Sequence, residues 1–139
     1  MDAPACVVGR LGPDGPWVGF APTLDDGYAL VVSSHAGTSR APAGAEDLLA
    51  LALAYFEEAL DEPSEELAPT HADIGAIVRH AADRALTAPS ALGEAVDAID
   101  DGLAADVVIE RLANAFGPGR DPVAHLRRRA AHLESPPSG

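Results

Sequence analysis

The sequence predicts an α+β protein in which an N-terminal three-stranded antiparallel β-meander precedes about five α-helices packed on one face of the sheet. Short runs of β-branched and aromatic residues separated by turn residues span about 5–34, and apolar residues then recur at helical spacing over about 45–134. Alanine supplies much of the 47% hydrophobic fraction, which is typical of closely packed helices. The length of 139 residues predicts a single domain over residues 1–134, with a disordered tail at 135–139.

Three runs account for the predicted strands. They read "CVVGRL", "WVGFAP" and "YALVVSS", and the turn-rich "GPDGP" and "TLDDG" separate them. Residues 35–44, "HAGTSRAPAG", are expected to form a loop because they combine glycine, proline and hydroxyl side chains. The meander therefore ends at about residue 34.

The most apolar helix is expected over residues 46–60. Leucines and alanines leave it almost no polar face, and Glu46 and Asp47 lie in its first turn, where the helix dipole favours acids. We therefore expect this helix to be buried on two sides, against the sheet and against later helices.

Four further helices are expected, at about 70–86, 90–100, 104–116 and 121–135. A stripe of Leu92, Val96, Ile99 and Leu103 marks the apolar side of the second of these four. Gly102 and Gly117 occupy positions typical of helix C-caps. Asp121 before Pro122 is a strong helix start.

Charge is the strongest global signal. The chain has 22 acidic residues against nine basic ones, giving a net charge of −13, and all nine are arginine. A GC-rich codon bias explains the missing lysine most simply, and avoidance of lysine modification is the alternative. Nucleic-acid backbones and anionic membranes should repel such a chain, so we expect neither as a direct partner. A basic protein partner is compatible with it, and self-association remains open.

The cysteine count and the apolar runs predict a cytoplasmic protein. Cys6 is the single cysteine and has no disulfide partner, no run approaches the roughly 20 apolar residues of a membrane span, and no targeting segment is evident.

The histidines lie apart in the sequence, at positions 35, 71, 80, 125 and 132. We therefore expect no metal site and no cofactor.

Residues 70–86, "THADIGAIVRHAADRAL", place two histidines and two aspartates close together in sequence. His71 and His80 would lie on opposite sides of a helix and cannot share a metal. Thr70 is a good N-cap, and Arg79 and Asp83 form an expected i, i+4 pair. Asp73 and His80 share one face, which leaves a weaker metal or catalytic alternative.

Three groups of side chains are candidate binding residues. The loop residues Ser33, Ser34, His35 and Arg40 resemble an anion-binding loop, against the simpler interpretation of a solvated turn. An acidic surface for a partner is expected at Glu57, Glu58, Glu62, Glu65 and Glu66. A basic stripe on the last helix comprises His125, Arg128, Arg129 and His132, and pairing with the protein's own carboxylates is its simpler explanation. Asp97, Asp100 and Asp101 are expected on a solvated face.

The run "DDGYALVVSS", followed by a loop and "GAEDLLALALAYFEEALDE", is similar to the sheet-and-helix half of HicB-type antitoxins. The resemblance covers about a third of the chain, and the family's small DNA-binding domain has no counterpart in the helical remainder. It implies partner binding. We therefore expect a non-enzymatic acidic protein-binding module, such as an immunity, antitoxin-like or accessory subunit. The alternative is a small enzyme or anionic-ligand-binding domain with its site in the Ser33–Arg40 loop.

Overall fold

The computed structural model describes residues 6–12, 16–23, 27–34, 37–57, 60, 71–84, 89–117 and 119–134. Antiparallel strands form one sheet in the order β1-β2-β3-β4, and helices follow in the second half of the chain. The strands are β1 (Cys6–Arg10), β2 (Trp17–Pro22), β3 (Tyr28–Ser34) and β4 (Gly37–Pro42). The helices are α1 (Ala45–Glu57), α2 (His71–Arg84), α3 (Pro89–Asp100), α4 (Ala105–Phe116) and α5 (Pro122–Glu134). The predicted α+β class is confirmed.

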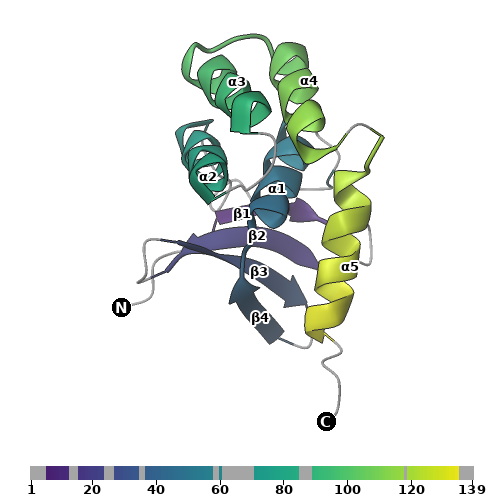
Figure 1. The fold of residues 1–139 in the computed structure, drawn as a ribbon. Helices are drawn as coiled ribbons and strands as arrows, with labels where there is room; N and C mark the ends of the chain where they lie inside the picture. The colour runs from purple at the N-terminus through teal and green to yellow at the C-terminus, as the bar shows by residue number, and fades with distance from the viewer. Residues whose placement is uncertain are drawn as a thin grey trace.

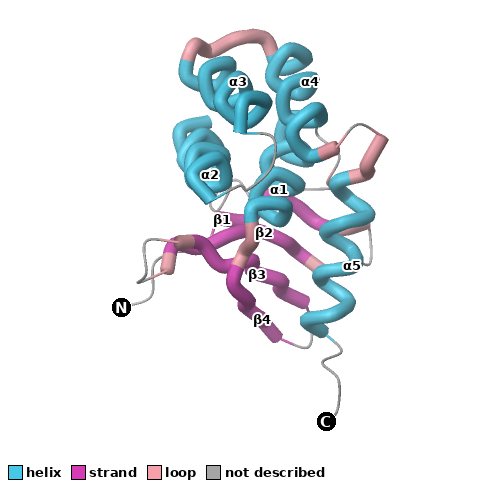
Figure 2. Tube along the Cα trace, in the orientation of Figure 1, coloured by secondary structure: helices cyan, strands magenta, loops and turns pink. Residues whose placement is uncertain are grey.

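The helices gather on one side of the sheet, as Figures 1 and 2 show. Helix α1 lies at the centre, where it contacts α2, α4, α5 and β1, while α5 runs down beside the sheet against β3 and β4. The pair α3 and α4 packs together at the end of the molecule farthest from β4. None of the described helices is long and apolar enough to cross a membrane. The expected tail at 135–139 lies outside the described residues.

The sequence prediction missed strand β4. Its residues, "GTSRAP", lack β-branched and aromatic side chains apart from one threonine, so the segment was expected to be a loop. The Ala43 N–H donates to the Tyr28 carbonyl at 3.0 Å. Because hydrogen-bonded pairs alternate in an antiparallel ladder, Pro42, opposite Ala29, has its nitrogen on the open edge. Its missing N–H therefore costs no ladder bond, and proline at such an edge hinders further strand pairing.

The core lies between the sheet and α1. Val18 pairs with Val32 and Phe20 with Leu30, so these four side chains share the face that meets the helices. In α1, Leu48, Leu49, Leu51 and Leu53 are at most 3% exposed, although they point in several directions around the helix. The expected burial of this helix on more than one side is confirmed.

The end of α3 corrects one predicted core residue. Leu92 is buried and Val96 and Ile99 pack against the core, but Leu103 is 48% exposed. Helix α3 ends at Asp100, and Gly102 adopts φ +67°, so the chain turns before Leu103 can continue the stripe. Gly117, the second expected C-cap, caps α4 with its N–H bonded to the Ala113 carbonyl at 2.9 Å.

Candidate functional site

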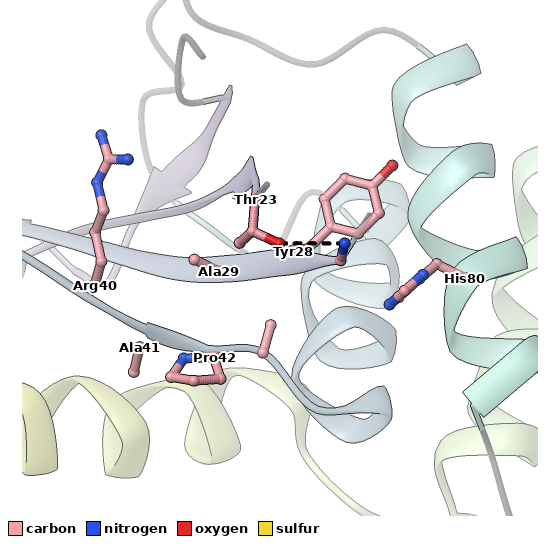
Figure 3. Close-up of a pocket in the computed structure, with 9 residues that line it drawn as sticks. Thr23, Tyr28, Ala29, Arg40, Ala41, Pro42 and His80 are labelled. Atoms are coloured by element: carbon pink, nitrogen blue, oxygen red, sulfur yellow. Dashed lines mark hydrogen bonds between the residues drawn. The ribbon is translucent and has the colours of Figure 1, made fainter. Parts of the chain in front are cut away.

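A pocket of about 420 Å³ lies where the end of the β3–β4 hairpin meets α2. Its lining comes from the β2–β3 connection, both hairpin strands and one helix: Thr23, Gly27, Tyr28, Ala29, Arg40, Ala41, Pro42, Ala43 and His80. Arg40 and His80 stand at opposite ends, with the small side chains of Ala29 and Pro42 between them, while Ala41 turns to the other face of β4 (Figure 3). The pocket therefore has a polar group at each end and a small apolar middle.

Tyr28 forms an aromatic wall of this pocket. Its ring meets His80 edge to face with centroids 5.2 Å apart, and it also meets Phe20 edge to face with centroids 5.7 Å apart. Burial raises the pKa of Tyr28, and the Asp73 carboxylate raises it further. The phenol is therefore a neutral hydrogen-bond donor. The Gly27 N–H donates to Thr23 Oγ1 at 3.2 Å, which fixes this hydroxyl beside the wall (Figure 3).

A smaller pocket of about 240 Å³ is also lined by Tyr28. Its lining residues are Cys6, Phe20, Pro22, Tyr28, Asp73 and Ala76. Burial raises the pKa of the Cys6 thiol, and Asp73 adds to the effect. A thiol held protonated in this way is a poor nucleophile.

Within residues 70–86, Asp73 and His80 were the two residues for which a shared metal or catalytic site was the weaker alternative. The structure places Asp73 in the smaller pocket and His80 in the larger one. Within the described ranges, no three His, Cys, Asp or Glu side chains come together in a group that could hold a metal ion. Thr70 and the side chain of His71 lie outside the described residues.

The predicted anion-binding loop is a β-hairpin instead. Ser33 pairs with Thr38 across β3 and β4, and their side-chain oxygens lie 3.1 Å apart. Arg40 lies opposite Val31 and lines the larger pocket, whereas Ser33 does not. The side chain of Ser34 and the whole of His35 lie outside the described residues.

The predicted acidic surface is described only at its first member. Glu57 is exposed at the end of α1, and its pKa is raised by partial burial and by the nearby charge of Asp121. Glu58, Glu62, Glu65 and Glu66 lie outside the described residues. Their role in binding remains a prediction.

The predicted basic stripe divides into two pairs. His125 and Arg129 turn inward to Asp47 in the first turn of α1, with His125 Nε2 at 2.7 Å and Arg129 Nε at 3.3 Å from Asp47 Oδ1. Arg128 and His132 are exposed. For His125 and Arg129, the simpler explanation, pairing with the protein's own carboxylate, is what the structure shows.

Buried Asp47 is the centre of this polar cluster. Its burial by itself raises the pKa, but the hydrogen bonds from His125 and from the Gly44 N–H, together with the Arg129 charge, hold the pKa below its ordinary value. Because an ionised carboxylate only accepts hydrogen bonds, His125 Nε2 carries a proton and donates it. The cluster ties α1 to α5 and is inaccessible to a large ligand.

Exposed carboxylates flank the turn between α3 and α4. Arg79 pairs with Asp100 at 2.6 Å, in place of the expected Asp83, and Arg111 pairs with Glu94 at 3.1 Å. The remaining acids here have no ion-pair partner among the described residues. Together with exposed Leu103 we call them the α3–α4 tip: Asp97, Asp101, Leu103, Asp106 and Glu110. The solvated face expected for Asp97, Asp100 and Asp101 is confirmed.

Comparisons with known proteins returned no relative: no family model matches the chain, and no significant match is found among curated proteins or solved structures. The similarity to HicB-type antitoxins gains no support from them and stays a prediction.

Proposed function

We propose that this protein is a non-enzymatic binding module, an accessory, immunity or antitoxin-like subunit, which docks a basic protein partner on the α3–α4 tip. The proposal rests on the exposure of Leu103. Its side chain is 48% exposed, and among the described residues it is the large hydrophobic side chain that stands in solvent. Asp101 and Asp106 flank it in sequence, so an apolar anchor stands among carboxylates. An apolar centre with a charged rim is the usual anatomy of a protein interface.

Charge complementarity gives the partner its chemistry. The carboxylates of the tip add to a net charge of −13, and a partner surface with clustered arginine or lysine would be attracted over several ångströms. Such attraction raises the association rate, while burial of Leu103 in an apolar pocket of the partner would slow dissociation.

The chemistry of the described side chains supports binding rather than catalysis. The Thr23 hydroxyl accepts a hydrogen bond from a backbone N–H, and the Ser33 and Thr38 hydroxyls bond each other, so the hydrogen bonds of these three described hydroxyls are not those of a nucleophile activated by a histidine base. The Cys6 thiol has a raised pKa. His125 is buried and engaged with Asp47. A non-enzymatic role is therefore favoured.

Affinity capture with matched variants tests the proposal. The wild-type protein is used as bait beside a tip variant that combines Asp97→Asn, Asp101→Asn and Leu103→Ser. A second variant replaces Glu57, Glu58, Glu62, Glu65 and Glu66 with glutamine, and Asp83→Asn controls for loss of an exposed charge elsewhere. We expect a basic protein that the wild type and the Asp83 control retain and the tip variant loses. Equal retention by the tip variant would refute docking at the tip.

A further inference from the structure

We infer that the 420 Å³ pocket between the β3–β4 hairpin and α2 is a binding site for a small organic anion: a carboxylate or phosphate ester carried on a flat apolar body. Pockets that hold small molecules typically span about 300–1,000 Å³ and combine an apolar lining with a few polar groups. This pocket has that composition. The inference does not depend on the proposed function, because none of the α3–α4 tip residues lines the pocket.

Arg40 is the group that selects an anion. Arg79, Arg111, Arg120 and Arg129 each pair with a carboxylate of the protein, but Arg40 forms no ion pair with any described residue. Its exposed side chain extends from β4 at one end of the pocket (Figure 3). A planar guanidinium presents parallel N–H donors that match carboxylate and phosphate oxygens. An anionic head group would therefore bind at this end.

The middle of the pocket accepts a flat apolar body. Ala29 contributes only a methyl group and Pro42 a rigid ring, and the register of β3 and β4 places both on the sheet face from which Arg40 extends. Ala41 lies opposite Leu30, so its methyl group turns to the other face. Short side chains here leave the space that longer ones would fill. The edge-to-face pair of Tyr28 and His80 closes the far end, and aromatic walls of this kind favour an aromatic ligand.

The remaining polar groups of the lining also favour an acceptor-rich ligand. The hydroxyl of Thr23 accepts its hydrogen bond from Gly27 and so keeps its own proton free to donate. Tyr28, with its raised pKa, is a neutral donor as well. The described lining residues include no carboxylate. A cationic ligand would find no ion-pair partner among them.

Amide NMR titration of the full-length protein tests this assignment. The probes are phenylacetate and phenyl phosphate as anions, phenylacetamide as the neutral counterpart of the first, and benzylamine as a cation. We expect saturable shifts of the Gly27, Ala29, Ala41 and Ala43 amides with at least one anion. The anion that binds with the higher affinity shows whether the site prefers a carboxylate or a phosphate head group. Phenylacetamide should bind about tenfold more weakly than phenylacetate, since it lacks the charge that a hydrogen bond to Arg40 exploits.

Two variants locate the anion. Arg40→Gln should weaken the bound anion about tenfold, whereas Arg127→Gln, at an exposed arginine of α5, should leave its affinity unchanged. Unshifted amides elsewhere would show that both variants keep the fold. The assignment is overturned if neither anion gives saturable shifts at millimolar concentration, if benzylamine binds as tightly as phenylacetate, or if Arg40→Gln retains full affinity.

Discussion

The carboxylate of Asp47 accepts a hydrogen bond from Nε2 of His125 at 2.7 Å, across a sequence separation of 78 residues. The side chains are only 8% and 11% exposed, and Arg129 lies against the same carboxylate oxygen. The contact joins the start of α1 to α5, the helix that packs on β3 and β4. It therefore links the central helix to the last element of the fold.

Removal of the Asp47 carboxylate should destabilise the protein strongly. Asp47→Ala leaves the buried His125 without its hydrogen-bond acceptor and the half-buried Arg129 without its counter-charge, and loss of one partner of a buried charge pair costs about 3–5 kcal/mol. Denaturant unfolding measures the change. Asp83→Asn, at an exposed aspartate of α2, is the matched control and should stay within about 0.5 kcal/mol. A similar small effect for both would show that the cluster contributes little.

The Asp47 contribution should be lost in acid. Its pKa is lowered from an ordinary value of 3.8, so the unfolded chain takes up the proton at a higher pH than the folded protein does. The stabilisation is therefore fully present above pH 3.8 and disappears as the pH falls through the lower folded pKa. The difference in unfolding free energy between wild type and Asp47→Asn, measured against pH, should shrink below that value. A difference that grows in acid would contradict the assigned direction.

Two leucines test where the core lies. Leu53 is 1% exposed in α1 and Leu103 is 48% exposed at the α3–α4 tip. Leu53→Ala should cost about 2–5 kcal/mol of unfolding free energy, and Phe56→Ala, also in α1, should cost a comparable amount. Leu103→Ala should change it by less than about 0.5 kcal/mol, because its side chain is largely in water already. Losses of equal size at Leu53 and Leu103 would contradict this placement of the core.

Two glycines should respond in opposite directions to alanine. A Cβ at Gly19 of β2 would overlap the backbone carbonyl of Cys6 in β1, so Gly19→Ala must push the two strands apart. Gly93 lies in α3, where a Cβ would meet open space. Gly93→Ala should therefore stabilise the protein by about 0.5–1 kcal/mol, the usual gain in a helix interior. Thermal unfolding of both variants gives the comparison, and a neutral Gly19→Ala would show that the strands can adjust.

The sequence predicted the helices well because each carries its own local signals. Pro122 after Asp121 marks the start of α5, and Gly102 and Gly117 mark the ends of α3 and α4. Strand β4 was missed because its stability comes from pairing with β3 and not from its residues. Local patterns do not contain that information.

The candidate sites were harder to predict because they depend on contacts between distant segments. Helical spacing places His125 and Arg129 on one face of α5, but it cannot reveal that Asp47 lies opposite them. Arg40 was singled out from the sequence, yet its neighbours in the pocket, Tyr28 and His80, come from other elements. Edge-to-face packing of those two rings leaves no signal in the spacing of either residue.

Salt and charge neutralisation separate the two acidic surfaces. Exposed charges separated by more than roughly 8 Å are largely screened at physiological ionic strength, so steering by carboxylates should appear as an association rate that falls as salt rises. If the segment from Glu57 to Glu66 contributes, the five glutamine substitutions should lower that rate at low salt while leaving the unfolding free energy unchanged. A rate equal to that of the wild type would restrict steering to other carboxylates.

Docking at the α3–α4 tip is tested most directly by the binding kinetics of the captured partner with wild type, Leu103→Ser, and the double variant Asp97→Asn and Asp101→Asn. We expect Leu103→Ser to raise the dissociation rate, because an apolar anchor is lost, and the double substitution to lower the association rate at low salt. Asp83→Asn should change neither rate. Wild-type association and dissociation rates in both tip variants would contradict the α3–α4 tip as the docking surface.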